Sequence, residues 1–233
     1  MTFDAGSPNN LFLTALRPAL AEVAIAEKAE GMDAYMKSAM PYLGAPSPAV
    51  RKTVRALAKE HPFSSVEQLR ATVTILWDGA HFREERYAAI MLTDSRLARG
   101  ELGLLPFYAV VIETGQWWDY VDSVAPRLND LLQQHRQTMD PVLREWSEHP
   151  NFWFRRAAVI AQLPAKAATD TQLLSDLMAP NLAEPEFFIR KAIGWALRQY
   201  ARTDPHWVRG YVAQHESLLS PLSRREALKH LNP

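Results

Sequence analysis

The sequence predicts an all-α protein built from repeated helices. Apolar residues recur at three- and four-residue spacing in stretches such as AVRKTVRALAKE and RYAAIMLTDSRLA, which is the spacing of one face of an α-helix. No stretch shows a clear strand-like alternation of apolar and polar residues. Residues that favour helix starts punctuate the chain, and we expect such starts at Ser47-Pro48, Ser64-x-x-Glu67 and Ser223-x-x-Glu226.

Similar segments recur along the chain with a nearly fixed period. RKTVR, RYAAI, VDSVA, RAAVI, KAIGW and REALK begin at Arg51, Arg86, Val121, Arg156, Lys191 and Arg225, in steps of 35, 35, 35, 35 and 34 residues. Such a period indicates stacked helical hairpins. It is shorter than the usual HEAT period and lacks the tetratricopeptide pattern, so we predict a HEAT-like solenoid of about six hairpins with a concave groove. Residues 1–233 are expected to form one domain, with a helical cap over about 1–45 and repeats over about 46–233.

Composition excludes several classes of site. The chain has 233 residues and no cysteine, which excludes disulfides, thiolate metal sites and cysteine catalysis. Its seven histidines show no spacing typical of metal ligands. We therefore expect neither a metal nor a cofactor.

Charge and hydropathy indicate an ordinary globular chain. The 26 basic and 26 acidic residues balance, which counts against nonspecific coating of nucleic acid. Residues 141–233 are mildly basic, with 12 basic and 9 acidic residues. The N-terminus does not resemble a signal peptide, and no apolar run approaches the roughly 18–20 residues of a membrane span. We expect a cytoplasmic protein without a membrane partner.

The stretch GQWWDYVDSV places aromatic and acidic side chains together. Numbered from the first residue of each repeat segment, Trp118, Arg156, Trp195 and Arg198 fall within an arc of about 80° on their helices, with Asp122 about 60° beyond it. Two tryptophans, two arginines and an acid are therefore expected to face one groove. The alternative is structural: both tryptophans fill the core, and Asp122 is a surface acid or pairs with Arg156.

Two adjacent pairs of cations leave a choice. Arg155 and Arg156 point about 100° apart, and the register favours Arg156 for the groove, whereas Arg155 is expected to brace a neighbouring repeat. Arg190 and Lys191 pose the same choice, and a phosphate contact is plausible for either.

Several longer blocks resemble a known family. QWWDYVDSVAP, NFWFRRAAVIAQL, EFFIRKAIGWALRQYARTDPHWV and SPLSRREALKHL are similar to segments of the DNA alkylation repair family of AlkD-type glycosylases, and the resemblance runs from about Glu27 to Leu231. It implies a HEAT-like solenoid that excises N3- and N7-alkylated purines from duplex DNA without a metal, and without the base flipping usual for glycosylases.

The resemblance also implies roles for individual residues. Trp118 and Asp122 match the catalytic tryptophan and aspartate, and Trp195 matches the second tryptophan facing the lesion. Arg156 matches the arginine beside the aspartate, Arg198 a DNA-contacting arginine, and Tyr35 an N-terminal tyrosine that reaches the DNA. Relatives can carry a lysine where this chain has Pro164, with Lys166 two residues later, which leaves a phosphate contact there open.

The residue types suit this chemistry. An alkylated purine is cationic and leaves without a general acid, so the oxocarbenium-like sugar needs a nearby negative charge and a positioned water. Indole faces attract cations, and arginines hold phosphates. The expected partner is double-stranded DNA with alkylated purines, bound by a monomer that needs no protein partner and associates with the nucleoid. The alternatives are a non-catalytic protein that binds distorted or branched DNA, and a peptide-binding scaffold.

Overall fold

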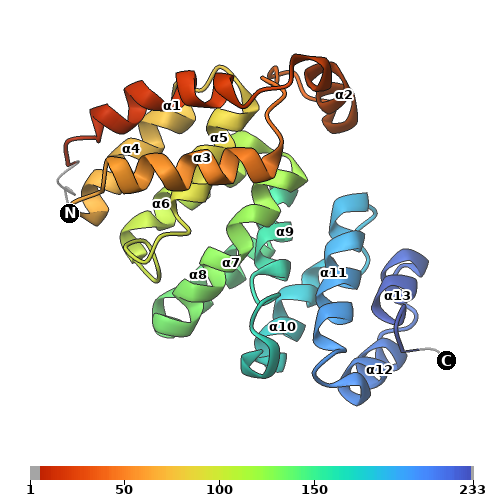
Figure 1. Cartoon of the computed structure of the whole chain (residues 1–233). Helices are drawn as coiled ribbons and strands as arrows, with labels where there is room; N and C mark the ends of the chain where they lie inside the picture. Colours follow the sequence, from red (N-terminus) through yellow and green to blue (C-terminus); the bar gives the residue numbers. More distant parts are fainter. Residues whose placement is uncertain (1–5, 232–233) are drawn as a thin grey trace. The chain divides into compact units, whose positions relative to one another are not determined.

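Every regular element of the structure is helical. The computed structural model describes residues 6–231, and this range contains thirteen α-helices and three short 3-10 helices but no strand (Figure 1). The all-α prediction is confirmed. The helices are α1 (Asn10–Glu22), α2 (Ala26–Met36), α3 (Ser47–Glu60), α4 (Val66–Asp78), α5 (Arg83–Leu92), η1 (Leu102–Leu104), α6 (Leu105–Gly115), α7 (Trp118–Gln134), α8 (Arg136–Ser147), α9 (Phe152–Ile160), η2 (Lys166–Ala168), α10 (Thr171–Met178), η3 (Ala179–Asn181), α11 (Phe187–Tyr200), α12 (Pro205–Gln214) and α13 (Pro221–Ala227).

The repeat found in the sequence corresponds to alternate helices. Its six segments lie on α3, α5, α7, α9, α11 and α13, and one further α-helix separates each from the next. The structural repeat is therefore a helical hairpin, as predicted.

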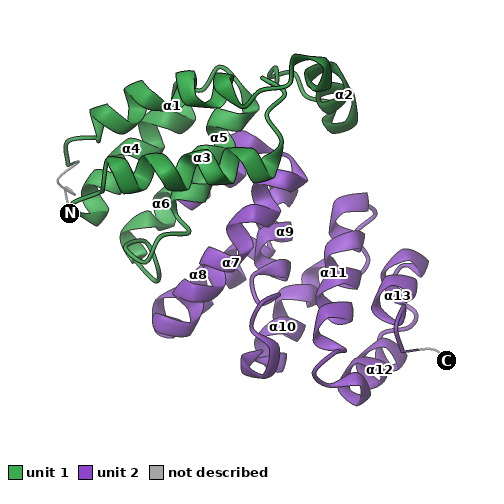
Figure 2. Cartoon of the chain, viewed as in Figure 1, with its two compact units in different colours: residues 1–107 green, residues 108–233 purple. Residues whose placement is uncertain are grey.

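The chain divides into two compact units, residues 1–107 and residues 108–233 (Figure 2). In the first unit, α1 packs against α3, α4 and α5, and α5 packs against both α3 and α4. Phe12, Leu16 and Leu20 of α1 are fully buried in this unit. The prediction of a single domain over residues 1–233 stays a prediction.

A buried carboxylate fixes the connection between α2 and α3. Glu84 is inaccessible to solvent, and its two oxygens accept hydrogen bonds from the backbone N–H groups of Leu43, Gly44 and Ala45 at 2.9–3.0 Å. Gly44 has a φ of 90°, and a Cβ at this position would lie 2.3 Å from the carbonyl oxygen of Ile25. The segment between α2 and α3 is therefore bound to α5 through Glu84.

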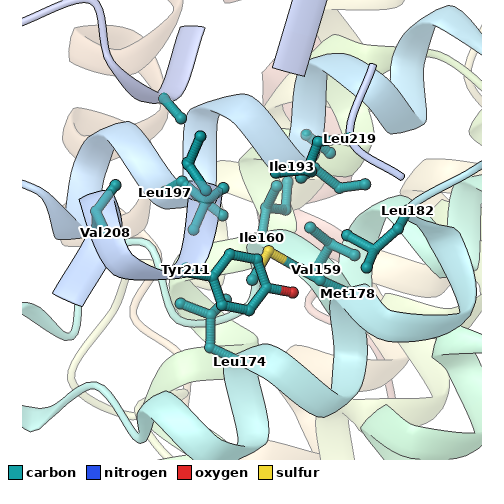
Figure 3. Packing of buried hydrophobic residues seen from close by; sticks show 14 of the residues in the cluster. Val159, Ile160, Leu174, Met178, Leu182, Ile193, Leu197, Val208, Tyr211 and Leu219 are labelled. Carbon is teal, nitrogen blue, oxygen red and sulfur yellow. The ribbon is translucent and has the colours of Figure 1, made fainter. Parts of the chain in front are cut away.

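The second unit has two layers of helices. Helices α7, α9, α11 and α13 contact one another in chain order, while α8 and α10 pack together and against α9, and α12 packs on α11 and α13. Buried side chains of α9 to α13, among them Val159, Leu174, Ile193, Val208 and Tyr211, form one continuous hydrophobic cluster (Figure 3). This cluster holds α11 and α13 in place.

The three predicted helix starts are each displaced. Ser65, not Ser64, caps α4 by accepting a hydrogen bond from the N–H of Gln68 at 3.1 Å. Helix α3 already includes Ser47, with Pro46 at its N-cap. Ser220 caps α13, which places Ser223 inside that helix. The sequence pattern located each helix but not its first residue, because neighbouring serines and prolines satisfy the same local rule.

Candidate functional site

The start of α7 is fixed by a backbone reversal followed by a packed indole. Gln116 has a φ of 41°, and its side-chain Nε2 donates a hydrogen bond to the carbonyl oxygen of Glu113 at 2.9 Å. Trp117 is the N-cap, and its ring lies edge-on to Phe188 of α11 with centroids 5.5 Å apart. Trp118 is consequently the first residue of the helix, and Asp122 lies about one turn later on the same face.

Asp122 and Arg156 form a bidentate ion pair between α7 and α9. The Nε of Arg156 donates to Oδ1 of Asp122 at 2.7 Å, and Nη2 donates to Oδ2 at 2.8 Å. Nη1 of Arg156 donates to the backbone carbonyl of Phe188 at 2.6 Å. All three guanidinium nitrogens are therefore engaged, and the arginine connects α7, α9 and α11. These helices contact one another in chain order in the second unit (Figure 1).

The pair is withdrawn from solvent. The side chains of Arg156 and Asp122 are 6% and 15% exposed. Burial raises the pKa of Asp122 above its ordinary value, Arg156 opposes that rise through its hydrogen bonds and charge, and the nearby Asp119 adds to it. Asp122 is thus a desolvated carboxylate whose charge depends on one arginine, a combination typical of functional sites.

The two candidate tryptophans are both half-buried. Within residues 6–231, the indole of Trp118 has no ring contact and no side-chain hydrogen bond. Trp195 packs part of its surface against the hydrophobic cluster of the second unit. Neither tryptophan is a fully buried core residue, so the structural alternative accounts for them only in part.

Two of the three basic side chains of α11 bind an acid from α13. Nζ of Lys191 lies 2.9 Å from Oε1 of Glu226, and Nη1 of Arg198 donates to Oε2 of the same carboxylate. These neighbours lower the pKa of Glu226, Lys191 having the largest effect. Two predicted DNA-contacting cations therefore share one half-buried counter-charge.

Arg155 and Arg190 differ in their surroundings. Arg155 forms an ion pair with Glu184 at 2.8 Å and donates to the carbonyls of His149 and Pro150. It braces the connection between α10 and α11, as predicted. Arg190 is half-buried, and its Nε has no hydrogen-bond partner among the described residues.

A family model described as DNA alkylation repair enzyme matches residues 16–231, nearly the whole chain. The chain belongs to the DNA alkylation repair enzyme family. This confirms the family expected from the sequence and assigns the chain to the repair of alkylated DNA.

One solved structure resembles this chain over most of its length. It is a predicted DNA alkylation repair enzyme from Enterococcus faecalis, with 34% sequence identity and a TM-score of 0.79, and the match covers 89% of this chain and 96% of that one. Another is the Pseudomonas fluorescens alkylpurine DNA glycosylase AlkC bound to DNA containing an abasic site analog. It shares 17% identity with a TM-score of 0.44, over 96% of this chain and 61% of that one. None of the curated proteins matches.

The repair protein does not bring all predicted site residues into one contact network. Asp122 and Arg156 are paired, and Lys191 and Arg198 gather around Glu226. Tyr35 lies on α2 in the other unit and is 77% exposed. Arg156 lies beside Asp122, as the resemblance implies. The contacts with DNA expected of these residues stay predictions.

Sequence reasoning missed two participants. Phe188 supplies both a carbonyl to Arg156 and a ring 5.9 Å from its guanidinium carbon. Glu226 was assigned to a helix cap, although it binds two of the three cations of α11. A signal for Glu226 exists in the repeat, because Glu226 and Asp122 both occupy the second position of their segments.

Lys166 is the first residue of η2. It is exposed and has a φ of 53°, which is uncommon for a residue other than glycine. Behind it, buried Gln162 exchanges two hydrogen bonds with the backbone of Asp170. These hydrogen bonds join the two ends of the loop that contains Lys166.

None of the helices within residues 6–231 combines the length and the apolar character that a membrane span requires.

Proposed function

We propose that the protein is a DNA glycosylase that excises cationic N3- and N7-alkylated purines from duplex DNA and leaves an abasic site. The observation that carries this proposal is the desolvated carboxylate of Asp122, held by Arg156 one turn from the free indole of Trp118. Membership in the DNA alkylation repair family supports it independently.

The reaction needs little beyond a fixed negative charge and a water. In an N7-alkylated purine nucleotide the base already carries a positive charge, so the bond between C1′ and N9 breaks and its electron pair leaves with a neutral purine. The positive charge then lies on the sugar, at C1′ and the ring oxygen. A water oxygen forms the new bond to C1′, and the water loses a proton to a general base of the protein. None of these steps requires a metal ion.

Asp122 is equipped for both tasks. Each of its oxygens accepts one hydrogen bond from Arg156, whereas a carboxylate offers about four acceptor sites. The remaining sites can orient the water and receive its proton. In a desolvated site a carboxylate stabilises a nearby cation far more than it does in water.

The tryptophans are proposed to contact the lesion nucleotide. An indole face attracts a cation by roughly 0.5–2 kcal/mol, with the larger value in a desolvated site. Trp118 has a face not used in ring contacts. Trp195 shares its helix with Lys191 and Arg198, which we propose bind phosphates.

The other predicted DNA contacts complete the proposal. Arg190 adds a further cation on α11, and exposed Tyr35 provides a contact from α2. Arg156 acts first on Asp122, because its nitrogens are engaged. A phosphate contact by Arg156 requires it to exchange one of these partners.

Single-turnover release of the base tests the proposal. The substrate is a duplex oligonucleotide with one N7-methylguanine, assayed with EDTA, and the proteins are the wild type and Asp122→Asn. We expect release by the wild type and a loss of about 10²–10³-fold in the variant, the usual cost of removing a transition-state electrostatic contact, with DNA binding retained. Equal rates for the two proteins would remove Asp122 from the mechanism.

A second function is favoured by one observation. The bidentate pair engages every nitrogen of Arg156, as a purely structural ion pair does. The protein would then bind distorted or branched DNA without excision. Tight binding without release from N7-methylguanine, and again none from N3-methyladenine, would establish this alternative.

A further inference from the structure

One face of α11 carries the two cations together with a glycine and a tryptophan. Lys191, Gly194, Trp195 and Arg198 occupy positions i, i+3, i+4 and i+7 of the helix, so their side chains lie along the same stripe. Glu226 of α13 binds both cations. The acid therefore lies between them on the stripe that also carries Trp195.

Gly194 provides the place where Glu226 sits. A Cβ on Gly194 would lie 2.6 Å from the Cβ of Glu226 and 3.0 Å from the carbonyl oxygen of Ser223. No side chain larger than hydrogen fits there without a shift of α13. The glycine thus brings the backbone of α13 close enough for Glu226 to reach cations on both sides.

The carboxylate lies beneath its partners. The side chain of Glu226 is 12% exposed, against 40% for Lys191 and 24% for Arg198. The cations consequently cover the acid and remain accessible themselves. Their charges lower the pKa of Glu226, which keeps it ionised at neutral pH.

Docking of α13 does not depend on this acid. The hydroxyl of Ser223 donates to the backbone carbonyl of Arg190 at 2.9 Å, and Ala227 of α13 is buried in the hydrophobic cluster with residues of α11. A neutral residue at position 226 would leave these contacts in place. The charge of Glu226 acts on the two cations.

We propose that Glu226 is a positioning residue for DNA binding. It fixes Lys191 and Arg198 in set directions beside Trp195 and cancels one of their two charges. Cations held in fixed directions reach the DNA phosphates only when Trp195 contacts the damaged nucleotide. Cations that are free to turn would bind the phosphates of any duplex. Glu226 therefore lowers affinity for undamaged duplex relative to alkylated duplex. This preference for damage rests on the proposed function.

The test is duplex binding as a function of salt. The proteins are the wild type, Glu226→Gln and the matched control Glu216→Gln, which makes the same charge change at an exposed acid that pairs with Arg224. We expect Glu226→Gln to bind undamaged duplex severalfold more tightly, with a salt slope steeper by about one unit, and to lose part of its preference for alkylated duplex. Binding by Glu226→Gln that equals that of Glu216→Gln would overturn the proposal.

A second variant separates orientation from charge and covers a failure of the first to fold. Glu226→Asp keeps the charge but withdraws the carboxylate by one methylene, so it no longer reaches both cations. We expect the wild-type salt slope on undamaged duplex with a reduced preference for alkylated duplex. An unchanged preference would overturn the positioning role.

The two proposals can fail separately. A wild type that neither releases the base nor prefers alkylated duplex contradicts the proposed function. The salt slopes on undamaged duplex do not depend on excision, and they still decide whether Glu226 governs the charge of Lys191 and Arg198.

Discussion

Asp122 and Glu226 occupy the same position of the repeat but lie in opposite electrostatic surroundings. Each is the second residue of its segment, and each binds the first residue of a neighbouring segment, Arg156 or Lys191. The pKa of Asp122 is raised, chiefly by desolvation. The pKa of Glu226 is lowered, chiefly by Lys191.

The comparison shows that repeat register places a charge pair and that the surroundings decide its chemistry. Around Asp122, a single arginine is covered by Phe188 and the helices that meet there. Around Glu226, both partners reach solvent. The same pairing of an acid with a base thus yields a desolvated carboxylate at Asp122 and two solvent-accessible cations around Glu226.

Removing the buried cation should have the largest effect. Arg156→Met leaves Asp122 desolvated without a partner, and we expect a loss of about 3 kcal/mol in the free energy of unfolding, measured by urea denaturation. Lys191→Met, at the more exposed pair, should cost less than about 1 kcal/mol. Equal losses of unfolding free energy in the two variants would contradict the difference between the Asp122–Arg156 and Glu226–Lys191 pairs.

A double variant checks the cause of that loss. Asp122→Leu combined with Arg156→Met removes both charges and should recover much of the stability, because no unpaired buried charge remains. If the double variant is as unstable as Arg156→Met alone, the loss comes from packing.

The pH dependence of excision should follow the charge of Asp122. In the proposed mechanism Asp122 acts as the ionised carboxylate, so we expect the rate to fall as the pH drops through its raised pKa. Asp119→Asn removes a charge that raises this pKa, and the acidic limb of the pH–rate profile should move to lower pH. Arg156→Gln should move the limb to higher pH. Single-turnover rates across the acidic pH range measure both shifts. If the acidic limb moves in the same direction in both variants, it does not report the pKa of Asp122.

Loss of one surface cation should have the smallest effect. Arg198→Ala is expected to weaken duplex binding, with a salt dependence shallower by up to about one unit of slope. Glu226 already neutralises part of this charge, so the full unit is an upper bound. Fluorescence anisotropy at several salt concentrations measures the slope, and an unchanged slope removes Arg198 from the phosphate contacts.

Much of the fold and the main pair of the site were accessible from the sequence. The 35-residue period located the six alternate helices, and the register placed Asp122 and Arg156 on neighbouring hairpins. The hydrogen bond from Arg156 to the carbonyl of Phe188 was not accessible, since the position of Arg156 on an ideal helix says nothing about the backbone of α11. Glu226 was misread as part of a cap because Ser223 and Glu226 have the right spacing for one.

The sequence by itself determined the helices, their period and the chemistry available at each position. These depend on side-chain type and on the 3.6-residue turn, which are local properties. Only the tertiary structure decided which acid is desolvated and which is surrounded by cations. Desolvation depends on atoms from α7, α9 and α11 together, and the reach of Glu226 depends on the close approach of α13 to Gly194.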